Sequence, residues 1–225
     1  MLSDNDHRDE FRKWIASNDF SVICLQEMLT SKKDSFYIEG YNRVFSGKMA
    51  AGSQLGLFIF TKYPVVGEGE IIFGNNSFNR GQWADLEIGA DTIRIVNVHL
   101  RSYDFRDDGW RENFRRLRSG MVGRSRHTQL VNDFIEKSSH PVVLCGDFNS
   151  MPFSYPYFKL RSKLNDSFVN SGAGLEYTYK VDRVPIRIDY IFTTPSLSGF
   201  DYQVLHDIKW SDHSPITLRI NFEDS

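Results

Sequence analysis

The sequence predicts an α/β protein in which layered β-sheets are covered by helices. Short, continuously apolar runs, which are typical of strands buried on both faces, occur beside segments that alternate between apolar and polar residues. Segments with helical periodicity lie between these strands. The chain has 225 residues, of which 40% are hydrophobic and 25% charged, and no repeat or linker interrupts it. We therefore expect one domain over residues 1–225, with a full core.

The expected elements follow in chain order. A helix opens the chain, because Phe11, Trp14 and Ile15 recur at helical spacing after Asp6, which would cap its first turn. Two further helices are expected at 110–119 and 125–137, and a short one at 152–160. Strands are expected at 20–26, 55–60, 65–73, 82–88, 92–100, 141–145, 186–193, 202–206 and 215–222.

Composition excludes several classes of protein. The net charge is −2, which argues against a large non-specific nucleic-acid surface. Patterns for nucleotide-binding loops, dinucleotide folds, serine hydrolases and zinc sites are all missing from the sequence. No run of 18 apolar residues predicts a membrane span. Cys24 and Cys145 lie in apolar runs, so we expect two small buried side chains.

Acidic residues fall where apolar strands would meet solvent. The first strand ends in Glu27, and the strand VNVHL places Asn97 and His99 on one face. If these positions converge, several carboxylates share one crevice and repel each other unless a proton or a cation intervenes. Oxygen ligands favour Mg²⁺ or Mn²⁺. Each residue alone could also be a turn, a cap or a core residue. The other positions are Asp147, Asn149, Asp189, Asp212 and His213.

The motifs LQE (25–27), VNVHL (96–100), GDFN (146–149), RIDYIF (187–192) and SDH (211–213) occur in this order. Together they resemble the endonuclease/exonuclease/phosphatase superfamily, which has the DNase I-like fold. The resemblance extends from about Asp19 to Ile220, and TKYPVV and GDFNSMPFSYPYF look closer to its bacterial members. It implies a four-layer α/β/β/α sandwich of two mixed β-sheets, packed face to face and flanked by helices.

The same resemblance implies a Mg²⁺- or Mn²⁺-dependent hydrolase of phosphate esters, in particular a phosphodiesterase or nuclease. A phosphomonoesterase and a non-catalytic binding module on the same fold are the alternatives. Glu27 and Asp212 would hold the metal, and Asp147 would orient or deprotonate the attacking water. His213, oriented by Asp189, would contact the scissile phosphate.

Further residues would contact the substrate. Asn149 would donate hydrogen bonds to the phosphate as charge develops on it, and His99 matches a phosphate-contacting histidine of the superfamily. Asn97, Arg101 and Arg126 are weaker candidates. The substrate class stays open between nucleic acid and a small or lipid phosphodiester. We expect a monomer.

Residues 101–126 carry eight arginines against four acids, a local charge of +4. Arg111, Arg115 and Arg118 fall on one helical face, which could be a solvated surface or a wall that grips phosphate. Trp110 and Phe114 could stack on a base or pack in the core, and we expect the core.

The superfamily begins with a core strand that carries an asparagine, whereas this chain goes almost directly from Met1 into a helix. The sequence therefore predicts a truncated N-terminus and an exposed sheet edge. The chain would then be an excised domain of a longer exported or membrane-anchored bacterial protein.

Overall fold

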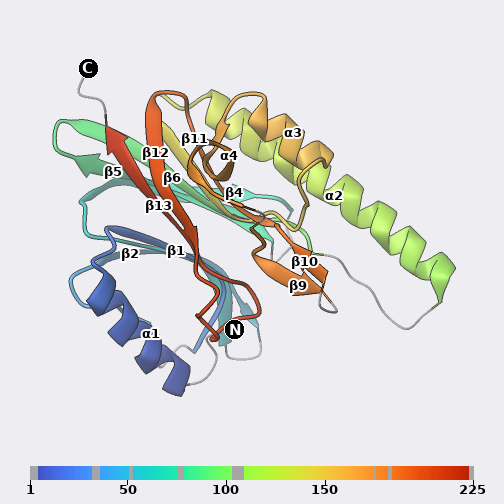
Figure 1. Ribbon diagram of the computed structural model, residues 1–225, viewed down its shortest axis with the longest axis horizontal. Helices are drawn as coiled ribbons and strands as arrows, with labels where there is room; N and C mark the ends of the chain where they lie inside the picture. Colours follow the sequence, from blue (N-terminus) through green and yellow to red (C-terminus); the bar gives the residue numbers. More distant parts are fainter. Residues whose placement is uncertain are drawn as a thin grey trace.

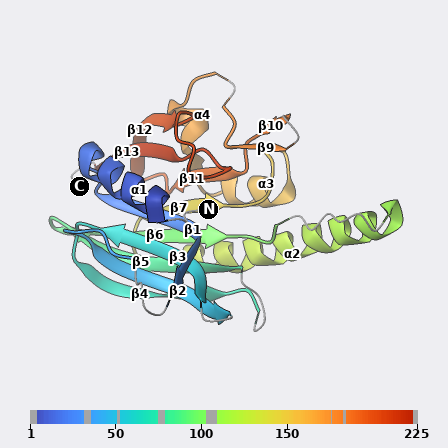
Figure 2. The ribbon, with the colours of Figure 1, turned by 90° about the horizontal axis from the view of Figure 1, so that it is seen from below.

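The computed structural model describes residues 5–31, 36–50, 53–74, 79–102, 109–174, 176–181 and 184–222. Its elements form four layers, with a helix on one outside, two layers of sheet in the middle and further helices on the other outside (Figures 1 and 2). This arrangement confirms the predicted fold class. No helix in the described ranges is long and apolar enough to cross a membrane.

The larger sheet has six strands in the order β4-β5-β6-β7-β11-β8. Of its neighbouring pairs only β6 and β7 are parallel, so the sheet is mixed. The register places His99 opposite Asp147 and Asp147 opposite Asp189, which sets three of the predicted site residues in a row across the sheet. Its strands are β4 (Val65–Ile72), β5 (Arg80–Ile88), β6 (Asp91–His99), β7 (Val142–Asp147), β8 (Asn165–Asp166) and β11 (Asp189–Thr193).

The second layer consists of two smaller sheets. One has the order β1-β3-β2 and the other is the hairpin β12-β13. Both are antiparallel, so the prediction of two mixed sheets is wrong for this layer. The strands of the pairs β2–β3 and β12–β13 follow each other in the chain, and strands connected in this way pair antiparallel. Val44 and Ile59 pack across the interface against Leu86 and Ile95. The strands are β1 (Val22–Ser31), β2 (Asn42–Ala50), β3 (Ser53–Thr61), β12 (Leu197–Val204) and β13 (Ile216–Phe222).

Helices cover the two outer faces. α1 (Asn5–Asn18) packs Phe11 and Ile15 on β1 and β3, while α2 (Trp110–Glu136) and α3 (Tyr155–Arg161) cover the larger sheet. α2 is one helix of 27 residues where the sequence predicted two. The helix continues through Gly123, where Cδ of Arg101 lies 2.9 Å from the position that a Cβ would occupy. The remaining elements are α4 (Ser167–Ser171), β9 (Tyr179–Val181) and β10 (Val184–Ile186).

A cavity of about 880 Å³ lies between the edges of β1 and β13. Among the described residues β1 pairs only with β3, and β13 only with β12, so both edges are open toward this cavity. Cys24 and Cys145 line it and are half-buried free thiols, whereas the sequence predicted two small buried side chains. The truncated N-terminus stays a prediction.

Candidate active site

The candidate site is built on the row of residues that crosses β6, β7 and β11. Pairing of β7 between parallel β6 and antiparallel β11 brings the carboxyl end of β7 next to the beginning of β11. Gly146, with φ +136°, permits this close pairing, because a Cβ there would lie 2.0 Å from the carbonyl oxygen of Val98. Asp147 and Asp189 consequently face each other as direct cross-strand neighbours.

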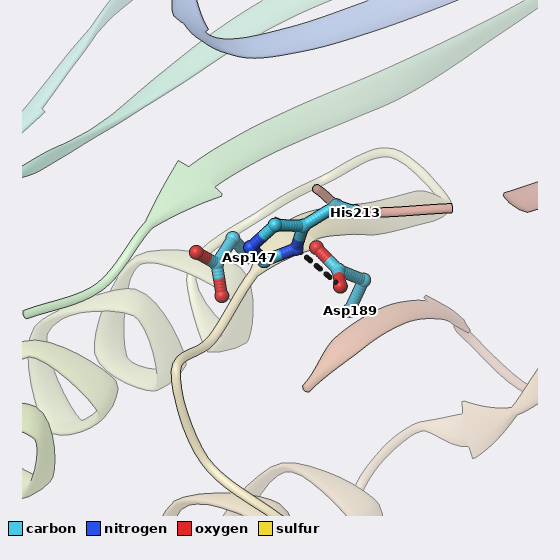
Figure 3. Close-up of side chains that lie close together, drawn as sticks. All are labelled: Asp147, Asp189 and His213. Atoms are coloured by element: carbon cyan, nitrogen blue, oxygen red, sulfur yellow. Dashed lines mark hydrogen bonds and ion pairs between the residues drawn. The ribbon is translucent and has the colours of Figure 1, made fainter. Parts of the chain in front are cut away.

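His213 joins the two carboxylates from the segment before β13. Its Nδ1 lies 2.8 Å from Oδ2 of Asp189, and Figure 3 shows the imidazole ring between Asp147 and Asp189. The backbone N–H of His213 donates to Oγ of Ser211, and the ring of Tyr179 packs on the imidazole with the ring centroids 4.6 Å apart. The orientation of His213 is therefore defined on three sides.

Asn149 holds the Asp147 carboxylate. Its backbone N–H donates to Oδ1 at 2.7 Å, and its side-chain Nδ2 donates to Oδ2 at 2.8 Å. The same Nδ2 donates to the carbonyl oxygen of Leu100 at 3.1 Å, so both amide hydrogens are used. The hydrogen bond to phosphate that the sequence predicts would need the amide to exchange one of these partners. Asn149 has φ +48°, a left-handed conformation that asparagine tolerates better than most residues.

Glu27 reaches the site through a bulge in β1. The register shifts between Leu25 and Met28, Glu27 has φ +51°, and its Oε1 lies 3.4 Å from Nε2 of His99. That Nε2 also lies 3.7 Å from Oδ2 of Asp147. The expectation that the first strand ends at Glu27 is wrong, because the bulge turns the side chain toward the site while β1 continues.

Asn97 supports this bulge and is not placed for a substrate. It is completely buried, its Nδ2 donates to the carbonyl oxygens of Leu25 and Phe58, and its Oδ1 accepts from Gln26. These contacts occupy both amide hydrogens and tie β6 to β1 and β3. The structure therefore corrects the expected substrate contact to a structural one.

The predicted residues at the rim are more loosely placed. Asp212 is exposed, and Oγ of Ser211 donates to it at 3.3 Å. Arg101 is half-buried two residues beyond His99, and Arg126 is exposed on α2. Both arginines help to lower the pKa of the buried His127.

The buried carboxylates of the row change each other's protonation. Burial and the charge of Asp189 raise the pKa of Asp147 to about 8. Burial lowers the pKa of His213, but the hydrogen bond and charge of Asp189 outweigh it and raise the pKa to about 9. Burial lowers the pKa of His99 against the charge of Glu27. Without a cation, one proton on Asp147 and an ion pair between Asp189 and His213 are favoured at neutral pH.

The carboxylates of this site could accept a divalent cation. Ligand atoms of Asp147, Asp189 and His213 all lie within 4.8 Å of one another, and a cation would relieve the repulsion that keeps Asp147 protonated. The predicted ligands Glu27 and Asp212 do not belong to this group of three. Glu27 is connected to it through His99, and the Asp212 charge contributes to the raised pKa of His213.

Sequence reasoning missed several supporting residues. Oγ1 of Thr178 accepts the N–H groups of Ile188 and Asp189, which fixes the start of β11. The hydroxyl of Tyr190, which has one hydrogen to donate, lies 2.7 Å from the carbonyl oxygen of Ser150 and 2.9 Å from that of Arg187, which connects the GDFN loop to β11. No local pattern marks Thr178, whereas Tyr190 lies within the RIDYIF motif.

Comparisons with known proteins identify the family of the chain and the structures that share its fold. The family model described as "Endonuclease/Exonuclease/phosphatase family" matches residues 1–213. The curated proteins contain no match. A humanized TDP2 of D. rerio has 16% identity and a TM-score of 0.77, covering 98% of this chain and 95% of the other.

Two further solved structures share the fold. The 3′ phosphatase NExo from Neisseria, bound to a product DNA hairpin, has 19% identity and a TM-score of 0.73, covering 97% of this chain and 95% of the other. A mannosyl-6-phosphatase of Bacteroides thetaiotaomicron has 19% identity and a TM-score of 0.70, covering 96% of this chain and 90% of the other. With the family model spanning nearly the whole chain, the protein belongs to the endonuclease/exonuclease/phosphatase family.

Proposed function

We propose that the protein is a divalent-metal-dependent phosphodiesterase that hydrolyses its substrate by in-line attack of water. Family membership supports a hydrolase of phosphate esters. The observation that carries the finer proposal is the convergence of Asp147, Asp189 and His213, with His99 and Glu27 beside them. This arrangement supplies a general base, a phosphate contact and oxygen ligands within one crevice.

In the proposed mechanism Asp147 accepts the proton of the attacking water. Its two oxygens are held by Asn149, so the carboxylate has one defined orientation. The Nδ1 of His213 is bonded to Asp189, which leaves Nε2 as a donor to a phosphoryl oxygen as negative charge develops there. Because Asp189 keeps the imidazole protonated, this donor carries a full positive charge.

We infer that Glu27 and Asp212 would hold the cation on the open side of the row, beside the carboxylate of Asp147. When bound, it supplies polarisation of a phosphoryl oxygen and compensation of negative charge. Asp147 would then be ionised at neutral pH, because the burial and repulsion that raise its pKa would be opposed by the positive charge.

A phosphomonoesterase is the second candidate, because two of the solved structures with this fold carry the name of a phosphatase. The two functions differ in the substrate rather than in the reacting groups. The test is hydrolysis of bis(p-nitrophenyl) phosphate and of p-nitrophenyl phosphate, each with Mg²⁺, Mn²⁺ or EDTA. We expect the diester to react faster, and EDTA to abolish the reaction.

The variant Asp147→Asn should lower the rate by roughly 10²- to 10⁴-fold, the range expected for loss of a general base. Asp207→Asn is the matched control, since Asp207 is an exposed aspartate outside the site, and its rate should equal that of the wild type. Equal rates for Asp147→Asn and wild type would refute the mechanism. Absence of both activities, together with calorimetry that detects no Mg²⁺ binding, would instead indicate a binding module.

A further inference from the structure

The outer half of α2 stands away from the rest of the molecule. In Figure 1 the helix projects past the sheets, and its free end is the green N-terminal end that begins at Trp110. The buried residues of α2 begin only at Gly120 and continue to Ile135. Residues 110–119 therefore form a helical extension that the core does not hold.

This extension and the helical turn after it carry an apolar stripe. Trp110, Phe114, Leu117 and Met121 recur at helical spacing, so they lie on one face. Trp110 is 75% exposed, Phe114 63% and Met121 56%, which corrects the expectation that the two aromatic residues pack in the core. A helix with such a stripe normally buries it against a partner.

Arginines accompany the stripe. Arg111, Arg115 and Arg118 are exposed and fall on the neighbouring face of the same turns. Glu112 is the one acid between residues 109 and 126. It is bonded to Arg115 at 2.8 Å and to Arg116 at 3.4 Å. The extension therefore joins an apolar face to a strongly positive one.

The segment after the candidate site adds to the apolar surface. α3, which packs on α2, and the turn before it expose four more large side chains. In the described ranges, nine of the fifteen exposed large hydrophobic residues come from α2 and this segment, and Leu130 lies apart from the others, nearer the C-terminal end of α2. We call the other eight, together with the three arginines, the α2–α3 surface. The eight are Trp110, Phe114, Met121, Val122, Met151, Phe153, Tyr155 and Phe158.

We propose that the α2–α3 surface docks onto an anionic phospholipid bilayer. A helix that has an aromatic and aliphatic stripe beside arginines lies in the interfacial plane of a membrane, where the apolar side chains enter the acyl region and the guanidinium groups contact lipid phosphates. Each arginine near an anionic surface adds to the attraction. The arrangement on α2 supplies both contributions from adjacent faces.

Other occupants match these residues less well. Pairing of two copies through this stripe would bring Arg111, Arg115 and Arg118 close to the same arginines, with Glu112 as the one acid between residues 109 and 126. A single-stranded nucleic acid would use the arginines and aromatic rings, but it would leave Met121 and Val122 exposed to water. A bilayer takes the apolar stripe into its acyl region and meets the neighbouring arginines with its phosphates.

Docking would place the candidate site close to the lipid headgroups. The guanidinium of Arg124, in the middle of α2, donates to the carbonyl oxygen of Arg101, two residues beyond His99. The turn that contains Met151 and Phe153 follows Asn149 directly. A membrane-borne phosphodiester as the substrate would rest on the proposed function, whereas the docking itself does not.

The test is flotation of the full chain with vesicles of phosphatidylcholine alone or with about 30% phosphatidylglycerol. We expect binding to the anionic vesicles that weakens at about 0.5 M salt, where charge is screened over short distances. Trp110→Ser with Phe114→Ser should lower the affinity about 30-fold or more, because two large apolar side chains no longer leave water. Replacing Arg111, Arg115 and Arg118 by Gln should lower it by about 100-fold on anionic vesicles.

The matched control is Val66→Ser with Ile72→Ser, since these residues of β4 are 57% and 64% exposed on another part of the molecule. This control should bind like the wild type. Trp110→Phe should keep binding but lose the blue shift of tryptophan emission that vesicles cause. All measurements are made in EDTA and repeated with Asp147→Asn, so that failure of catalysis does not affect the result.

Absence of vesicle binding by the wild type would overturn the proposal. Unchanged binding in the double serine variant, or in the triple glutamine variant, would overturn it equally. If the same variants instead lose binding to a single-stranded oligonucleotide, while vesicles are not bound, the surface is a nucleic-acid site and the membrane proposal is wrong.

Discussion

Replacement of Asp189 by Asn should remove the positive charge from His213 at neutral pH. The structure raises the pKa of this imidazole from 6.5 to about 9, although burial alone would lower it. A rise of this size corresponds to about 3 kcal/mol in favour of the protonated form. Since the hydrogen bond and the charge of Asp189 are the main causes, Asp189→Asn should bring the pKa of His213 below 6.5.

The assay is an NMR titration of the histidine side chains in EDTA from acid to alkaline pH. His213→Gln identifies the resonance, and Asp212→Asn is the matched control, because the charge of Asp212 contributes less to the shift than that of Asp189. The control should lower the pKa of His213 only slightly. A pKa that stays above 8 in Asp189→Asn would refute the assignment of Asp189 as the partner that charges the imidazole.

The same pair predicts how stability depends on pH in the metal-free protein. The pKa of His213 is higher in the folded state than in the unfolded state, so the stabilisation is fully present below 6.5 and is lost as the pH rises through about 9. Denaturant unfolding at several pH values should show this loss for the wild type. Asp189→Asn should lack that component, and an identical pH profile in both proteins would contradict the ion pair.

Three further predictions concern the framework of the site. Gly146→Ala should lower the unfolding free energy by about 3 kcal/mol or prevent folding, because a methyl group would meet the carbonyl oxygen of Val98 at φ +136°; a melting temperature equal to wild type would contradict it. Burial and nearby arginines hold the pKa of His127 at about 4, so the unfolded state gains a proton before the folded state does as the pH falls. In urea unfolding, the wild type should therefore lose about 2 kcal/mol of unfolding free energy between pH 7.5 and 5, and His127→Phe should not show this loss. Arg187→Met should lower the unfolding free energy by about 3–5 kcal/mol, because it removes the guanidinium that lies 2.9 Å from the buried carboxylate of Asp166. Adding Asp166→Asn to this variant should restore stability, which is the check.

The sequence predicted most of the strands of the larger sheet because their apolar runs are uninterrupted. It missed β2, whose residues Asn42–Ala50 include Arg43, Gly47 and Lys48 and show no clear alternation. β2 forms because β3 pairs with it along its whole length, a contact between segments that no local pattern reports. The same limit applies to the two-residue strand β8.

The candidate site was predictable in its residue types but not in its geometry. The motifs identified Asp147, Asp189 and His213, which the structure brings together. They could not show that Glu27 lies on a bulge, because a left-handed residue within a strand leaves no mark in the amino-acid pattern. They also suggested a substrate contact for Asn97, because a polar residue on a strand near a site looks the same whether it faces solvent or carries the hydrogen bonds of a neighbouring strand.

The pairing of β7 with β11 imposes a cost that points to the function. Two carboxylates that are direct neighbours on a buried sheet destabilise the fold unless a proton or a cation compensates them. A purely structural site would be better served by an apolar pair at this position. The framework nevertheless keeps both acids in place through separate contacts, with Asn149 on Asp147, and with Thr178 and His213 on Asp189. Such a conflict between local stability and fixed geometry is typical of residues that are retained for chemistry.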